Sequence, residues 1–202
     1  MGKIKFTKGE LKRQRDALKQ YERYLPTLQL KKQQLQLEIL HHSGLLEKKE
    51  LESETKYKYA LTWSAFLTEE VAGLKGWLKP EEVLISSKNV AGVDVPVFQS
   101  VRFGAAEYDL FVTPLWVDPG LEALKELVSL EKEIQTVKDG ISILRHELRI
   151  TTQRVNLFEK IMIPRIQANI KKIKVFLSDQ QLAAVCQAKV AKRKIIERMA
   201  VG

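Results

Sequence analysis

The chain has 202 residues, of which 45% are hydrophobic and 29% charged, and it carries a net charge of +9 with only 10 Gly and 6 Pro. So few chain breakers favour long helices over a sheet-rich fold, and a single cysteine excludes an intramolecular disulfide. No apolar run reaches the ~20 residues of a transmembrane helix, and no apolar stretch follows the basic start as it would in a signal peptide.

The positive charge is concentrated at the two ends of the chain. Residues 1–23 hold eight Lys and Arg against three acids, and residues 160–202 hold ten against two. The segment between them, 24–159, has a net charge of −4. Either both ends are solvated helix termini, or the ends meet in space and form one basic tip.

Residues 1–78 are predicted to form one long helix. Thr7 and Glu10 match a capping box at its start, and Pro26 predicts a kink rather than a break. Its apolar residues follow steps of three and four: Leu11, Leu18, Tyr21, Leu25, Leu28, Leu35, Ile39 and Leu46. A second ridge is expected to widen this apolar face, formed by Leu30, Leu37, Leu40 and Leu51.

Residues 79–120 differ in composition from the rest of the chain. "VLISSKNVAGVDVPVFQSVRF" and "YDLFVTPLWV" are rich in Val, Phe and Ile and are bounded by Gly and Pro. We expect a β-hairpin or a small irregular lobe, because about forty residues cannot build a sizeable core of their own. Aromatic residues gather around this insert, either closing the end of the helices or forming a docking surface: Trp63, Phe66, Trp77, Phe103, Tyr108, Phe111 and Trp116.

Residues 121–202 are predicted to form a second long helix. The seam residues alternate strictly by three and four: Leu127, Leu130, Ile134, Val137, Ile141, Leu144, Leu148, Thr151, Val155, Phe158 and Met162. This heptad pattern is typical of a coiled coil. After Pro164 the pattern resumes one position later, at Ile166, Ile170 and Ile173, which predicts a bend or local unwinding near the proline.

The two segments together predict an all-α, elongated fold. Roughly 70 and 80 residues at ~1.5 Å per residue would give helices of matched length, about 105 and 120 Å. Antiparallel pairing, with the insert at the helix connection, would bury both apolar seams and bring both basic ends together. The central members of the coiled-coil seam would be Leu18, Leu25, Leu28, Leu35, Ile39, Ile134, Ile141, Leu148, Val155, Phe158 and Met162.

Catalytic and metal-binding signatures are absent from the sequence. The histidines, His41, His42 and His146, have no cysteine or paired carboxylate at metal-ligand spacing. Cys186 has no neighbouring base, and the carboxylates of "ELESETKYK" are expected to form a solvated face. The sequence therefore predicts neither an enzyme in its own right nor a bound cofactor or metal.

Two stretches resemble a known family. "KGELKRQRDALKQYERYLPTLQLKKQQLQLE" and "TTQRVNLFEKIMIPRIQANIKKIKVFLSDQ" are similar to the two helices of the D subunit of V-type and archaeal A-type rotary ATPases. "RVNLFE" followed by "IP", and "LKKQQLQ", are the most specific parts, whereas residues 81–120 are the least similar. The resemblance implies a non-catalytic rotor axle, an antiparallel coiled coil with a short β-hairpin near the helix connection.

The same resemblance implies the partners. The axle's terminal end would enter a ring of catalytic and nucleotide-binding subunits (A and B), and its other end would meet the F subunit of the stalk and a funnel-shaped subunit on the membrane ring. The protein would be cytoplasmic and reach the membrane only through the complex. Charge position and family geometry together suggest the ring-facing residues: Lys5, Lys12, Arg13, Lys19, Arg165, Lys171, Lys172 and Lys189.

Two other function classes compete with the axle. A basic coiled coil can bind nucleic acid through its phosphates, but no groove-reading motif is present and the middle of the chain is acidic. A membrane or cytoskeletal tether would need a broader amphipathic face than this heptad seam provides.

Overall fold

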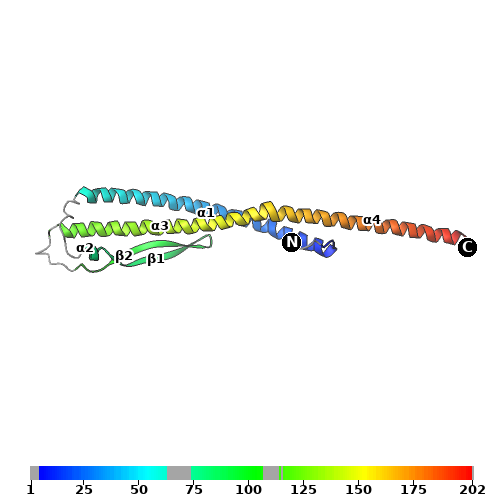
Figure 1. Ribbon diagram of the computed structural model, residues 1–202, viewed down its shortest axis with the longest axis horizontal. Helices are drawn as coiled ribbons and strands as arrows, with labels where there is room; N and C mark the ends of the chain where they lie inside the picture. The colour runs from blue at the N-terminus through cyan, green and yellow to red at the C-terminus, as the bar shows by residue number, and fades with distance from the viewer. Residues whose placement is uncertain (1–4, 63–73, 107–113, 115, 202) are drawn as a thin grey trace. The chain divides into compact units, whose positions relative to one another are not determined.

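The computed structural model describes residues 5–62, 74–106, 114 and 116–201. These form two compact units: a terminal unit, Met1–Leu30 with Thr151–Gly202, and a hairpin unit, Lys31–Ile150. The elements in chain order (Figure 1) are α1 (Lys8–Thr62), α2 (Leu74–Trp77), β1 (Pro80–Val90), β2 (Val93–Phe103), α3 (Val117–Leu157), the π-helix η2 (Phe158–Met162) and α4 (Ile163–Val201). Long helices with one small antiparallel hairpin between them confirm the predicted fold class.

Helix α1 begins where the sequence predicts. The Glu10 backbone N–H donates a hydrogen bond to Thr7 Oγ1 at 3.2 Å, so Thr7 is the N-cap. Glu10 Oε1 then accepts a hydrogen bond from Gln14 Nε2 at 2.7 Å, one turn further on. The helix continues through Pro26, so the proline does not break it.

The helix expected to reach about Leu78 is described as far as Thr62. A single helical turn, α2, precedes the hairpin. Residues 63–73 lie outside the described part of the chain, as do the predicted aromatic positions Trp63, Phe66, Tyr108 and Phe111. Helix α3 begins at Val117, four residues before the predicted Leu121, with Asp118 favourably placed in its first turn.

The insert is a two-stranded antiparallel hairpin, β1 paired with β2. Its turn consists of Ala91 and Gly92, both with positive φ, 51° and 77°. Two positive φ values in a two-residue loop define the turn whose twist matches the strands. Asn89 supports it, because its Oδ1 accepts a hydrogen bond from the Gly92 N–H at 3.1 Å while its Nδ2 donates to Asp94 Oδ1 at 2.7 Å.

The core of the hairpin unit joins both strands of the hairpin to α1 and α3. Val90 and Val95 of the hairpin tip pack with Leu35 of α1 and Leu144 of α3, and each of the four is at most 7% exposed. Gly140 on α3 makes this approach possible, because a Cβ at that position would lie 2.9 Å from Val95 Cγ1. Figure 1 shows the hairpin running beside α3.

A π-helical turn separates α3 from α4. The Ile163 N–H donates to the Phe158 carbonyl, five residues back, and this turn immediately precedes Pro164. Pro164 has no N–H to donate, and its ring would crowd the carbonyl four residues earlier in a regular helix. A π-turn adds one residue to the helix, so the apolar pattern shifts by one position. The predicted local unwinding is confirmed.

Candidate functional site

The interface between the two long helical segments is the principal structural feature of both units. Among the predicted seam residues, Leu35 is 0% exposed and Ile141 and Val155 are each 4% exposed. The other eight are only partly exposed: Leu18, Leu25, Leu28, Ile39, Ile134, Leu148, Phe158 and Met162. Thr151, the polar residue on the predicted seam, is 1% exposed. Burying one such apolar side chain fully contributes about 1.5–3 kcal/mol.

Beyond the π-turn the terminal unit keeps a buried stripe. Ile166, Ile170 and Ile173 on α4 are 7%, 8% and 0% exposed. Aromatic pairs mark the antiparallel register, with ring centroids 5.0 Å apart for Tyr21 and Phe158 and 4.9 Å for Phe6 and Phe176. Residues nearer the N-terminus of the chain therefore pair with residues nearer its C-terminus, which is the antiparallel arrangement.

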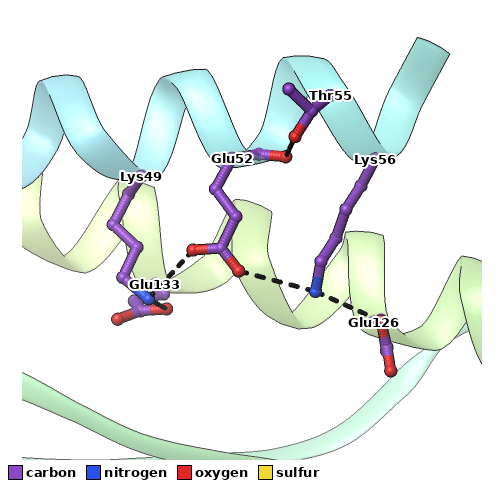
Figure 2. Close-up of polar contacts among 6 residues, drawn as sticks. All are labelled: Lys49, Glu52, Thr55, Lys56, Glu126 and Glu133. Carbon is purple, nitrogen blue, oxygen red and sulfur yellow. Dashed lines mark hydrogen bonds and ion pairs between the residues drawn. The ribbon is translucent and has the colours of Figure 1, made fainter. Parts of the chain in front are cut away.

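Ion pairs cross the helix interface of the hairpin unit. Figure 2 shows Lys49 and Lys56 of α1 reaching Glu133 and Glu126 of α3, each with a nitrogen–oxygen distance of 3.1 Å. Glu52 lies between the two lysines, at 3.4 and 3.5 Å from their Nζ atoms. Two more pairs join these helices: Lys31 with Glu147 at 2.9 Å and Lys138 with Glu50 at 2.8 Å.

These contacts involve the expected solvated face and explain two pKa shifts. Glu50 and Glu52 take part in the ion pairs while their side chains stay 49% and 43% exposed, so both remain in contact with solvent. Hydrogen bonds to Glu133 and Glu126, respectively, are the main cause that raises the pKa of Lys49 and of Lys56. Charged residues flanking a coiled-coil seam in this way set helix orientation and register.

The second apolar ridge does not widen the interface as expected. Leu30, Leu37, Leu40 and Leu51 are 57%, 67%, 69% and 64% exposed. At 3.6 residues per turn these positions point to roughly the opposite side of α1 from Leu35. Leu37 and Leu40, with Gln33 and Gln36, line an open groove of about 600 Å³.

The predicted ring-facing residues all belong to the terminal unit, and all are exposed: Lys5, Lys12, Arg13, Lys19, Arg165, Lys171, Lys172 and Lys189. The structure brings three of them, Lys5, Arg13 and Arg165, to one groove of about 470 Å³. Lys12 and Lys19 line another groove, of about 780 Å³, together with basic residues that the sequence reasoning did not single out: Lys8, Arg15 and Lys174. Their charge was visible in the sequence, but their common groove depends on helix pairing.

The C-terminal part of α4 extends past the N-terminal end of α1 (Figure 1). Residues 178–199 are exposed at every position, including Leu182 at 69% and Met199 at 79%. The expectation of two helices of matched length is therefore wrong for this end of the chain. Lys189 lies on this extension, beyond the pair formed by Phe6 and Phe176.

Neither a metal centre nor a membrane-spanning helix is found among the described residues. No three His, Cys, Asp or Glu side chains there are grouped so that they could hold a metal ion. Within the same part of the chain, no helix combines the length and apolar character needed to cross a membrane.

Comparison with known proteins identifies the family. The family model for the D subunit of ATP synthase matches residues 10–193. The V-type ATP synthase D subunit of Borreliella burgdorferi is 45% identical over 198 residues, 98% of each chain. The proteins of the same name from Chlamydia pneumoniae and Chlamydia caviae are 36% and 35% identical, over 98% and 96% of this chain and 96% and 95% of their own. The chain therefore belongs to the family of ATP synthase D subunits.

Proposed function

We propose that this chain is the non-catalytic central stalk of a V-type ATP synthase. It transmits torque between the ring that hydrolyses or synthesises ATP and the membrane ring that translocates protons or sodium ions. Family membership supports the complex, and the helix interface supports the mechanical role. That interface is the observation on which the proposal mainly rests, because it combines a buried apolar seam with ion pairs that cross from helix to helix.

A shaft that carries torque must resist sliding and unwinding of its two helices. The seam opposes separation, because pulling the helices apart would expose side chains such as Leu35 and Leu144, both 0% exposed. The ion pairs oppose sliding, because a shift along the axis breaks Lys49–Glu133 and Lys56–Glu126 together. Each exposed pair contributes only ~0.2–1 kcal/mol, so the ion pairs set register more than stability.

The terminal unit is proposed to enter the ring of A and B subunits. Residues 1–23 and 160–202 carry charges of +5 and +8. Positive side chains at the surface attract acidic loops over several ångströms without a fixed fit, which suits contacts that must move from one subunit to the next. The eight ring-facing residues named above belong to this surface.

The hairpin unit is proposed to meet the F subunit of the stalk and the funnel-shaped subunit. Exposed leucines Leu37, Leu40 and Leu51 give α1 an apolar surface within the hairpin unit, which favours this region for the F subunit. The membrane is then reached only through the complex, on its cytoplasmic side.

Charge reversal tests the proposed ring contacts. Lys12→Glu, Lys19→Glu and Arg165→Glu are combined in one variant, and Arg145→Glu with Arg149→Glu, two exposed positions of α3 in the hairpin unit, serve as the control. The first variant is expected to weaken assembly with the A–B ring and to stall ATP-driven rotation, and the control to behave like the unmodified chain. Intact assembly and rotation in the first variant would refute the assignment.

The alternative function, nucleic-acid binding, makes an opposite prediction. If the basic groove containing Lys8, Lys12 and Lys174 bound phosphates, the affinity for duplex DNA would fall steeply as salt increases. Under the stalk proposal the chain co-purifies with the ATPase ring and shows no such binding.

A further inference from the structure

The tip of the hairpin is seated in a notch between the two helices. Val95 is 1% exposed and Val90 is 7% exposed, and both pack with Leu35 and Leu144. Gly140 forms the floor of the notch, because a Cβ there would lie 2.9 Å from Val95 Cγ1. Elsewhere in the hairpin, Ile85 of β1 is 53% exposed and Val97 of β2 is 37% exposed. Val90 and Val95 are the two buried side chains of β1 and β2, so the fully buried part of the hairpin is its tip.

A titratable group lies next to this contact. His42 of α1 lines an open groove of about 810 Å³, whose other wall is the hairpin tip with Lys88, Asn89 and Ala91. Within the described residues, the Nδ1 atom of His42 is buried and has no hydrogen-bond partner. A neutral imidazole tolerates this arrangement, because one ring nitrogen carries no proton. An imidazolium would place a second N–H donor, unpaired, in the same buried position.

The charges around His42 come from both sides of the groove. Burial is the main cause that lowers the pKa of His42 from its ordinary value of 6.5, and His41 and Lys88 lower it further. Glu38 on α1 acts in the opposite direction. Among the described residues, the charged groups that shift this pKa belong to α1 and the hairpin, and none belongs to α3. Lys88 is the one of these groups that belongs to the hairpin, so its repulsion disappears when the tip leaves the notch.

We propose that the hairpin tip is a proton-sensitive latch: it is docked on α1 and α3 while His42 is neutral and is released when His42 binds a proton. The latch goes beyond the stalk role and does not depend on the chain's partners, because every contact in it lies within the hairpin unit. The position of the hairpin would then respond to the pH of the solution around this protein.

The direction of the effect follows from linkage. The docked tip holds the pKa of His42 below 6.5, and in the released tip this pKa returns towards 6.5. Above that pH both states are neutral and docking is at full strength. As pH falls below 6.5, the released state binds a proton that the docked state excludes, so docking weakens by up to about tenfold per pH unit. Below the pKa of His42 in the docked state, both states bind the proton, and docking weakens no further.

Methyl NMR of the full-length chain tests the latch. The signals of Val90 and Val95 report docking, and Gly140→Leu, which fills the notch, provides the signals of the released tip. On titration from pH 7.5 to 5.0 the Val95 methyls are expected to move towards the Gly140→Leu positions, in step with the His42 Hε1 signal. His42→Leu should abolish this movement, whereas His41→Gln, at the exposed neighbouring position, should retain it.

Two results would overturn the latch. One is a Val95 signal that stays constant while His42 titrates, and the other is the same pH response in His42→Leu. If His42→Leu folds poorly, a second measurement keeps His42 in place and compares its pKa between the unmodified chain and Gly140→Leu. The pKa of His42 must rise in Gly140→Leu relative to the unmodified chain, and an unchanged pKa would equally exclude the proposal.

Discussion

The π-turn before Pro164 predicts an unusual tolerance to deletion. Upstream of it the interface contains Thr151 and Val155, 1% and 4% exposed, and downstream Ile166 and Ile173, 7% and 0% exposed. The downstream residues lie one position later than a continuous heptad would place them. Deleting one residue inside the π-turn would therefore leave both stripes facing the interface. Lys160, which is exposed, is the residue to remove.

The deletion is made in a Pro164→Ala background, because a proline inside a regular helix costs about 3 kcal/mol. Without Lys160 the π-turn closes into an ordinary α-helical turn, and no buried side chain changes its facing. We expect the free energy of unfolding to stay within about 1 kcal/mol of Pro164→Ala alone, because the removed π-turn has no side chain of its own in the core.

Deletion of Ser142, also exposed, is the matched control in the same background. If the π-turn closes in response, the register downstream of it is restored. Every residue between position 142 and the π-turn would still be rotated by about 100° about the helix axis. Leu144 and Val155, 0% and 4% exposed, are among them, and at 1.5–3 kcal/mol each their exposure costs roughly 3–6 kcal/mol.

Urea unfolding of the full chain, followed by far-UV circular dichroism, measures the difference. If the two deletions lower the free energy of unfolding by the same amount, the π-turn does not set the register of the interface.

Three further substitutions test other parts of the structure. Leu144→Ala should lower the free energy of unfolding in urea by about 2–5 kcal/mol, whereas Leu37→Ala, 67% exposed, should change it by less than about 0.5 kcal/mol; equal losses would place Leu144 outside the core. Ala91→Gly should stabilise the hairpin by about 1 kcal/mol, because Ala91 has φ of 51°, and hydrogen exchange of the hairpin amides should slow accordingly; faster exchange would contradict the turn geometry. A double-mutant cycle of Lys49→Ala and Glu133→Ala should give a coupling of about 0.2–1 kcal/mol that shrinks in 1 M salt, and a coupling insensitive to salt would contradict a screened ion pair.

Much of the fold follows from the sequence alone, because heptad periodicity and turn chemistry act locally. The steps of three and four from Leu127 to Met162 predict the second helix, and Thr7 marks the start of the first. The one-position shift after Pro164 predicts the unwinding, since a proline removes a backbone donor wherever it occurs in a helix. Family resemblance and charge then led to the rotor hypothesis and its basic residues.

Other features were decided only by tertiary structure, because they depend on which surfaces meet. Leu37 and Leu35 are equally apolar, yet one is 67% exposed and the other 0%, since Val90, Val95 and Leu144 pack against Leu35 and not against the opposite side of the helix. The sequence does not tell whether Gly140 makes room for another segment or only weakens the helix. The approach of Val95, whose Cγ1 would lie 2.9 Å from a Cβ at position 140, shows that it makes room. The groove around His42 likewise exists only when the hairpin is docked, because two segments more than forty residues apart supply its walls.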